Sequence, residues 1–425
     1  MKIEILNGHL VDPANKIDQT TNLFIADGKV AAVGHRPPGF KAKKTIDASN
    51  HLVIPGIVDI GMRLGEPGID HTEQINCESK AAVSAGITTL CCFPDTGPII
   101  DTPAEIDSIQ RHQRQAGQAH IHVIAALTKE LAGTELSEMA SLKAAGCLGV
   151  SNTWQPLDSS RVARRALEYA ASHDLTVYIH PEDHGLLDNG CAHEGAVATR
   201  LGLPGIPEAA ETAAIGFYLP LIEATGARVH FCRLSTRQGI KMIRRARHDG
   251  LPITADVNAH QLFLTEMDLA DFNPLFHTRP PLRTMRDRDG LREALSNGSL
   301  QAICSDHLPL SPDAKLAPFP ATLPGISALE TLLALTLRLV EEKVIELTDA
   351  IRLLTAGPAE ILDIKAGQLG TDDRADISII DPEASWECDP YQFQSEGKNS
   401  PFGGWHFKGR VTKTLVAGKT VFVRR

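Results

Sequence analysis

Two histidines separated by one residue, His120 and His122, have a spacing suited to metal chemistry. Side chains two residues apart leave the same face of a β-strand, and two imidazoles on one face can bind a metal such as zinc. His122 lies in an apolar stretch, 121–126, that predicts a strand, and His120 directly precedes that stretch. The spacing resembles that of a metal-binding pair, although a structural role for both histidines is the favoured interpretation.

A second pair of positions with the same spacing cannot bind a metal. Residues 57–63 follow a turn at Pro55-Gly56 and predict a strand, on which positions 61 and 63 share one face. Gly61 has no donor atom, and the guanidinium of Arg63 is a permanent cation without a lone pair to give. This strand end therefore repels a divalent cation.

The elements that position these side chains follow from apolar runs that alternate with helical patterns. The apolar runs that predict strands are 57–63, 88–93, 121–126, 148–151, 176–180, 228–234, 253–257 and 300–305. The helical patterns cover 103–115, 159–173, 208–224, 237–249 and 326–342. Eight strands that alternate with helices predict an α/β fold, namely a (β/α)8 TIM-type barrel.

Both chain ends have a different pattern. Short alternating segments separated by turn residues predict strands at 3–6, 21–25, 29–33, 375–381 and 411–422. We expect the two ends to pair into one small β-sandwich domain, built from residues 1–54 and 367–425, with the barrel at 55–366. The proline-rich stretch 309–324 predicts a surface loop.

Composition limits the partners and the compartment. The 425 residues include 52 Asp and Glu against 42 Lys and Arg, and the net charge of -10 argues against nucleic acid or an anionic membrane as the main partner. No apolar stretch approaches the roughly 20 residues that cross a bilayer, and the first residues contain no apolar signal core. The eight cysteines form no CxxC pair, which favours buried, reduced thiols. We therefore expect a cytoplasmic protein.

Several short blocks occur in a fixed order along the whole chain. They are Pro55-Gly56 with Asp59, Glu66-Pro67-Gly68, Ala85–Thr89, Phe93–Thr96, His180–Asp183, Leu234–Thr236, Pro280–Arg283, Ser305–Pro309, Pro324–Ile326 with Leu329–Thr331, and Gly397–Phe402. With these blocks the chain resembles the dihydroorotases of the amidohydrolase superfamily. The resemblance implies metals at the carboxyl ends of the barrel strands and hydrolysis of a cyclic amide by a metal-bound hydroxide, with an aspartate that shuttles the proton.

The resemblance also implies a set of six metal-site groups, of which this chain keeps two. The two first-strand histidines are replaced by Gly61 and Arg63, the bridging Asp or modified Lys is missing from 150–154, and the last histidine is replaced by Arg233. His180 and Asp306 remain as vestiges of the metal site and of the proton shuttle. His120 and His122 lie on the wrong strand for this site, and His230, three residues before Arg233, faces the opposite side of its strand.

Two ligands opposed by two arginines fall short of the three protein ligands that hold a catalytic zinc. We therefore expect no metal, no cofactor and no catalytic residue. Because a buried carboxylate without its metal needs another cation, we expect Asp306 to pair with Arg63 or Arg233. The substrate-binding positions of the family are replaced as well, by Gly65, Asp95, Arg279 and Leu310.

Within the family, the chain looks like the inactive dihydroorotase-like chains that assemble with aspartate carbamoyltransferase in some bacteria. This likeness implies a structural subunit of pyrimidine biosynthesis, a homodimer within a hetero-oligomer, with the catalytic subunit of that enzyme as partner. Two alternatives stay open. One is a diverged cyclic amidohydrolase with a single zinc held by His180, Asp306 and a third ligand such as His260 or His307. The other is a barrel that senses an anion, such as a nucleotide, in an arginine-lined pocket.

Overall fold

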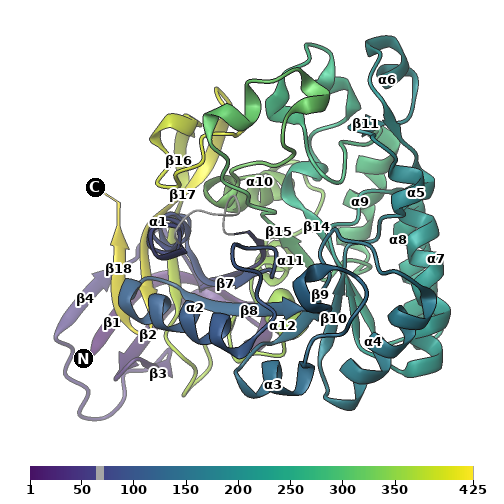
Figure 1. Ribbon diagram of the computed structural model, residues 1–425. Helices are drawn as coiled ribbons and strands as arrows, with labels where there is room; N and C mark the ends of the chain where they lie inside the picture. The colour runs from purple at the N-terminus through teal and green to yellow at the C-terminus, as the bar shows by residue number, and fades with distance from the viewer. Residues whose placement is uncertain (64–70, 425) are drawn as a thin grey trace.

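A parallel barrel forms the larger part of the computed structural model, which describes residues 1–63 and 71–424 (Figure 1). Its strands pair in the order β6-β7-β8-β9-β10-β13-β14-β15. Their bounds are β6 (Ile57–Met62), β7 (Ile87–Cys92), β8 (His120–Ala126), β9 (Gly149–Ser151), β10 (Thr176–Ile179), β13 (Val229–Phe231), β14 (Ile253–Asn258) and β15 (Ala302–Cys304). Each strand coincides with one of the eight predicted apolar runs, so the predicted barrel is confirmed.

The first and last strands approach each other at the carboxyl end of the barrel. The backbone N–H of Arg63, just after β6, donates to the carbonyl of His307 at 2.9 Å. The backbone N–H of Ser305, just after β15, donates to Oδ1 of Asp59 at 2.9 Å. These bonds bring the ends of β6 and β15, and with them Arg63 and Asp306, to one side of the barrel mouth.

Helices surround the barrel (Figure 1). The longer ones are α1 (His71–Ser84), α2 (Pro103–Ala116), α4 (Ser160–Ser172), α7 (Glu208–Thr225), α8 (Arg237–His248), α9 (Met285–Ser296), α10 (Leu329–Glu341), α11 (Leu347–Leu354) and α12 (Ala356–Leu362). The shorter ones are α3 (Met139–Ala144), α5 (His184–Leu187) and α6 (Ala196–Leu201), and a two-stranded ladder joins β11 (Ala192–His193) to β12 (Gly205–Ile206). None of the described helices has both the length and the apolar character needed to cross a membrane.

Helix α8 illustrates why these segments are helical. The side chain of Thr236 caps its first turn by accepting a hydrogen bond from the backbone N–H of Gly239 at 2.9 Å. Its buried residues Ile240, Ile243 and Ala246 recur at helical spacing and face the barrel, while the charged residues lie on the other side. The helix therefore covers β13 and β14 with one apolar stripe and fixes the end of β13, where Arg233 lies.

The two ends of the chain form one eight-stranded sheet, the terminal sheet. Its order is β18-β17-β16-β5-β1-β2-β3, with β4 paired to β1. Its strands are β1 (Ile3–Asp12), β2 (Ile17–Ala26), β3 (Lys29–Val33), β4 (Lys44–Asp47), β5 (Leu52–Pro55), β16 (Ile377–Glu387), β17 (His406–Val416) and β18 (Lys419–Val423). The antiparallel pairing of β5 with β16 joins the two ends, as expected, and the strands enclose a small apolar core of their own. The chain passes from this sheet to the barrel at Gly56, whereas the domain limits at 54 and 366 stay a prediction.

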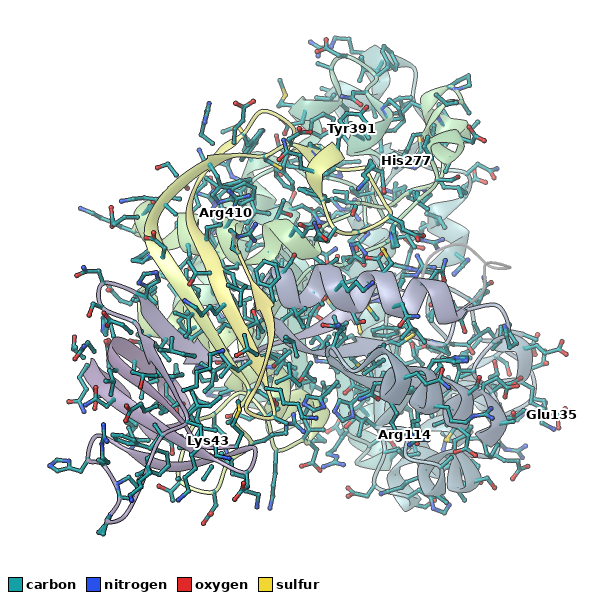
Figure 2. The ribbon with its side chains drawn as sticks, turned by 90° about the vertical axis from the view of Figure 1, so that its left-hand side faces the viewer. Lys43, Arg114, Glu135, His277, Tyr391 and Arg410 are labelled. Carbon is teal, nitrogen blue, oxygen red and sulfur yellow. The ribbon has the colours of Figure 1, made fainter. Side chains whose placement is uncertain are left out.

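The long strand β17, one of the yellow strands in Figure 2, also runs along the outside of the barrel, where it contacts α1 and α10. Short 3-10 turns occur at Pro13–Asn15, Lys129–Leu131, Ala259–Leu262, Glu266–Leu269, Pro274–Phe276, Pro312–Lys315, Phe319–Ala321 and Pro390–Gln392. Two of these turns lie in the proline-rich stretch 309–324. That stretch is more packed than a plain surface loop, because Phe319 is buried against His277 and the Nζ of Lys315 donates to the carbonyl of Leu323 at 2.7 Å.

Candidate functional site

The guanidinium of Arg233 lies at the centre of the barrel mouth. Arg233 follows β13 and is only 2% exposed. Its Nε lies 2.7 Å from Oδ1 of Asp306, and its Nη1 donates to Nε2 of His180. The two groups that survive from the family's metal site therefore both contact one arginine. Of the two pairings expected for Asp306, the structure forms the one with Arg233.

The surroundings of Arg233 hold it in place. Its backbone N–H donates to Oδ1 of Asp256, whose other oxygen lies 3.2 Å from Nε2 of His230. The guanidinium carbon lies 4.7 Å from the centroid of the Phe93 ring, within the range of a cation–π contact. Arg233 has a φ of 59° and Asp306 a φ of 52°, a left-handed conformation that residues with a Cβ adopt at a cost. These contacts maintain the strained backbone that aims both side chains at each other.

The electrostatics of this group are dominated by burial. Burial raises the pKa of Asp306 to about 6, although Arg233 and Arg63 oppose the shift. Burial and the adjacent Arg233 lower the pKa of His180 well below its usual value, so that its imidazole is neutral. Because Arg233 donates to Nε2, the ring proton of His180 lies on Nδ1. The lone pair on Nε2 of His180, which could bind a metal, therefore already accepts a hydrogen bond from Arg233.

Two further arginines at the mouth also have carboxylate partners. Arg63 forms an ion pair with Asp95. The Nε of Arg279 donates to Oε1 of Glu182 at 2.9 Å, and its guanidinium carbon lies 4.7 Å from the Trp154 ring. Asp95 and Arg279 occupy positions of the family's substrate site, and here each is part of an ion pair. The three arginines and their three carboxylates form a neutral cluster.

The remaining positions of the family's metal site fit a metal no better. A Cβ added at Gly61 would lie 2.9 Å from Cβ of Cys304 and 3.0 Å from the backbone nitrogen of Asp306. Where the bridging group is expected, Asn152 has a neutral amide whose Oδ1 accepts a hydrogen bond from Thr128 at 2.6 Å. Gly65, at another substrate position, lies outside the described residues.

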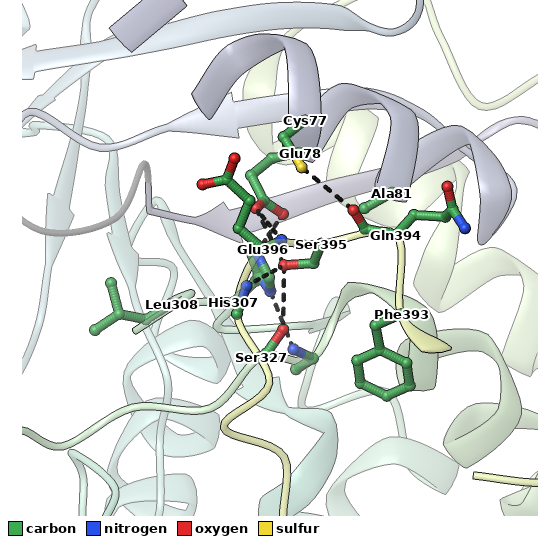
Figure 3. Close-up of polar contacts among 12 residues, drawn as sticks. Cys77, Glu78, Ala81, His307, Leu308, Ser327, Phe393, Gln394, Ser395 and Glu396 are labelled. Atoms are coloured by element: carbon green, nitrogen blue, oxygen red, sulfur yellow. Dashed lines mark hydrogen bonds and ion pairs between the residues drawn. The ribbon is translucent and has the colours of Figure 1, made fainter. Parts of the chain in front are cut away.

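The two candidates for a third ligand differ in their surroundings. His307 is fully buried, its Nε2 lies 2.9 Å from Oε2 of Glu78, and its Nδ1 accepts the backbone N–H of Ala328 at 3.0 Å. Figure 3 shows this pair beneath α1, where Ser395 also donates to Glu78 at 3.1 Å. Both ring nitrogens of His307 are therefore occupied in a contact between α1, the barrel and the C-terminal segment.

His260 is 1% exposed, and neither of its ring nitrogens has a hydrogen-bond partner among the residues that the structure describes. Burial lowers its pKa to about 3. In the part of the chain that the structure describes, no group of three or more His, Cys, Asp or Glu side chains is arranged to hold a metal ion. The donors present at the barrel mouth do not fit a catalytic zinc, because Arg233 contacts two of them and Glu78 a third.

His120 and His122 lie at the other end of the barrel. His120 is the first residue of β8, and its Nε2 lies 3.4 Å from a carboxylate oxygen of Asp376 beside the terminal sheet. Burial lowers the pKa of His122 to about 4. His120 is therefore part of the contact between barrel and sheet, and both histidines lie at the start of β8, away from the mouth.

A cavity of about 330 Å³ opens beside the paired arginines. Its charged walls are Arg63, Asp95, Arg279 and Asp306, and its apolar walls include Trp154, Leu308, Leu310 and Leu323. Leu310, at a position where the family has a histidine, is buried and makes the wall apolar. The cavity thus lacks an unpaired cation for the carboxylate of an anionic substrate, among the residues that the structure describes.

Sequence reasoning missed three partners of these side chains: Glu182, Asp256 and Asn258. Asn258 donates to Oδ2 of Asp306 at 2.9 Å. Glu182 could have been found, because it lies two residues after His180 in an extended segment, and such residues point to the same side. Asp256 and Asn258 show the same spacing at the end of β14, next to the strand that carries Arg233.

Comparison with known proteins agrees with this fold. A model of the family described as "Dihydro-orotase-like" matches residues 50–239. The "Dihydroorotase-like protein" of Pseudomonas putida is 44% identical over 418 residues, which cover 98% of each chain. The "Dihydroorotase" of Syntrophotalea carbinolica is 42% identical over 422 residues, which cover 99% of each chain.

Among solved structures, the L-hydantoinase of Arthrobacter aurescens superposes with a TM-score of 0.87 at 23% identity, over 100% of this chain and 97% of that one. At this identity the likeness shows the fold alone. The two relatives above, at 42–44% identity over nearly the full length of each chain, show the family as well. This chain belongs to the dihydroorotase-like family of amidohydrolases.

Proposed function

We propose that this chain is a catalytically inactive member of its family, in which arginines take the place of the metals. The observation that carries the proposal is Arg233, whose guanidinium contacts both His180 and Asp306. A divalent cation needs the same lone pairs and would be repelled by the fixed positive charge. Without a metal, the pKa of water stays at about 16 instead of about 7, so no hydroxide forms at neutral pH.

We propose further that the chain is a structural subunit that promotes assembly of aspartate carbamoyltransferase in de novo pyrimidine biosynthesis. The support is its likeness to inactive dihydroorotase-like chains and the name of the Pseudomonas putida relative, "Dihydroorotase-like protein". A chain that keeps its barrel and terminal sheet without a catalytic centre is most simply retained for its surface. In this proposal it acts in the cytoplasm as a homodimer bound to the catalytic subunit.

Co-expression of this chain with the aspartate carbamoyltransferase catalytic subunit of the same organism tests the structural role. Size-exclusion chromatography with light scattering should give one large species that contains both chains. A hydantoinase is a suitable control, because it shares the barrel fold and should elute separately from the transcarbamoylase. If the transcarbamoylase elutes at the same volume with and without this chain, the structural role is wrong.

The single-metal hydrolase remains the second candidate, and His260 is the observation that favours it. Its ring nitrogens form no hydrogen bond with any described residue, whereas both ring nitrogens of His307 do. For His180 and Asp306 to bind zinc together with another ligand, Arg233 would first have to leave both. The anion-sensing alternative gains no support at the mouth, because Arg63, Arg233 and Arg279 each have a carboxylate partner.

A further inference from the structure

A second cavity, of about 250 Å³, lies away from the barrel mouth. It is enclosed by the end of α1, by α10 and by the strands β16 to β18 with the segment that follows β16. Two arginines line it, Arg410 on β17 and Arg424 just after β18. Figure 2 shows Arg410 beside the C-terminal strands, drawn in yellow. It shares no lining residue with the cavity at the barrel mouth.

Within the described residues, neither arginine forms an ion pair with a carboxylate, unlike the arginines at the mouth. The guanidinium carbon of Arg410 lies 5.2 Å from the centroid of the Trp386 ring. Arg424 donates from Nε to the carbonyl of Val411 at 2.8 Å and from Nη2 to the carbonyl of Ser84 at 3.0 Å. These contacts fix the positions of two cations without neutralising them.

The two guanidiniums also affect each other. Burial lowers the pKa of Arg424 and the positive charge of Arg410 lowers it further, while the negative charge of Glu330 opposes this shift without reversing it. Two adjacent cations in a partly buried cavity are an unfavourable arrangement that a bound anion relieves. The guanidinium group is suited to such an anion, because its planar set of donors matches two oxygens of a phosphate or carboxylate.

Three acidic residues line the same cavity, and within the described residues none of them forms an ion pair with Arg410 or Arg424. Oε1 of Glu330 accepts the backbone N–H groups of Gln394 and Ser395, and burial raises the pKa of Glu330 to about 7. The two carboxylate oxygens of Asp389 accept from the backbone of Tyr391 and the side chain of Gln392, each at 3.0 Å. Glu387 is exposed, so solvent and salt screen its charge.

We propose that this cavity binds a phosphate group between Arg410 and Arg424, either as free phosphate or as a small phosphate monoester. At pH 7 a phosphate monoester carries a charge of about −1.5 to −2, which matches two guanidiniums, and it has enough oxygens for both. The volume of about 250 Å³ lies just below the roughly 300–1,000 Å³ of small-molecule sites, which favours a small ligand. Nothing in this proposal depends on the role in assembly.

Isothermal titration calorimetry of the full chain tests the proposal with two probes, inorganic phosphate and glycerol phosphate, with chloride used to fix the ionic strength. We expect saturable binding of at least one probe with one site per chain, and the tighter of the two identifies the source of the phosphate group. Arg410→Gln and Arg424→Gln should each weaken binding about tenfold or more. Arg410→Gln removes the contact with the Trp386 ring but, among the described residues, no hydrogen bond, so this variant should melt close to the temperature of the parent.

Arg338→Gln is the matched control. Arg338 also lies over an aromatic ring, with its guanidinium carbon 5.0 Å from the Trp405 centroid, but it is not part of the cavity wall. This variant should bind the probes as tightly as the parent. The proposal is overturned if neither probe gives saturable heat, or if Arg410→Gln and Arg338→Gln bind with equal affinity. Failure of co-assembly with the transcarbamoylase would leave this result unchanged, so the two proposals are tested separately.

Discussion

Arg233 and Asp306 form a buried ion pair across the barrel mouth, with 2.7 Å between Nε and Oδ1. Asp306 is 9% exposed, at the position where the sequence resemblance implies the proton-shuttling aspartate. Its negative charge therefore has a compensating cation from the protein itself. This pair explains how the barrel can fold around an intact strand-end carboxylate without any metal.

Arg233→Met should strongly destabilise the protein, because it leaves Asp306 buried without a counter-ion. Removing one partner of a buried pair typically costs about 3–5 kcal/mol of unfolding free energy, which urea denaturation measures. Arg63→Met is the matched control, since its pair with Asp95 is more exposed, at 25% and 15% of the side chains, and should cost less.

The double variant Arg233→Met with Asp306→Leu should recover much of this loss, because no uncompensated charge remains in the mouth. Equal losses for Arg233→Met and Arg63→Met, or no recovery in the double variant, would show that Arg233 is not the counter-ion of Asp306.

Histidines placed at positions 61 and 63 should fail to restore a metal site. The Cβ of the new residue 61 would lie 2.9 Å from Cβ of Cys304, so the strand must shift to accept it. Arg233 would still contact His180 and Asp306. We expect the double variant to unfold at lower urea concentration than the parent and to contain no stoichiometric zinc. Hydrolysis of dihydroorotate by this variant would contradict the account.

His260 should make the protein less stable as the pH falls. Its pKa is about 3 in the fold against an ordinary value near 6.5, so the unfolded chain binds a proton that the folded chain does not. The stabilisation is therefore complete above pH 6.5 and is lost as the pH falls toward 3, by up to about 1.4 kcal/mol per pH unit.

In His260→Leu, the slope of unfolding free energy against pH between pH 6 and pH 4 should be smaller by the amount that corresponds to about one proton. This variant breaks no hydrogen bond in the described structure, so its stability at pH 7 should stay close to that of the parent. Other buried histidines and the raised pKa of Asp306 act equally in both proteins and cancel in the difference. Parallel curves of unfolding free energy against pH would show that His260 is protonated equally in both states.

The barrel mouth should not respond to anionic nucleotides. A ligand at 100 times its dissociation constant stabilises the fold by roughly 2.7 kcal/mol, which a thermal-shift assay with UTP or CTP detects. Because Arg279 is already paired with Glu182, any shift should persist in Arg279→Gln. A shift that Arg279→Gln abolishes and Arg410→Gln leaves intact would support the anion-sensing alternative.

Local sequence patterns were sufficient for most of the barrel. The eight strands are short, apolar and buried on both faces, which is the pattern that parallel strands leave in a sequence. Helix α1 was missed because its sequence, from His71 to Ser84, is mostly polar and lacks a clear apolar stripe. Strands β4 and β5 were missed because four residues are too few to show alternation. Pairing of β5 with β16 links residues that are more than 300 positions apart, which no local pattern contains.

The loss of the metal ligands could be recognised from residue types alone, since Gly61, Arg63 and Arg233 cannot donate a lone pair. The sequence could not decide which arginine pairs with Asp306 in place of a metal, because Arg63 and Arg233 both lie at strand ends at the mouth. The structure distinguishes the two arginines: Arg63 forms its ion pair with Asp95, and Arg233 forms the ion pair with Asp306. Which arginine pairs with which carboxylate depends on the distances between side chains on different strands. These distances are set only when the barrel closes.

Zinc content and dihydroorotate hydrolysis, measured on the same purified chain after equilibration with zinc, test the central claim most directly. The account predicts far less than one zinc per chain and no hydrolysis above the rate without protein. One or more zinc ions per chain, lost in Asp306→Asn together with measurable hydrolysis, would contradict it.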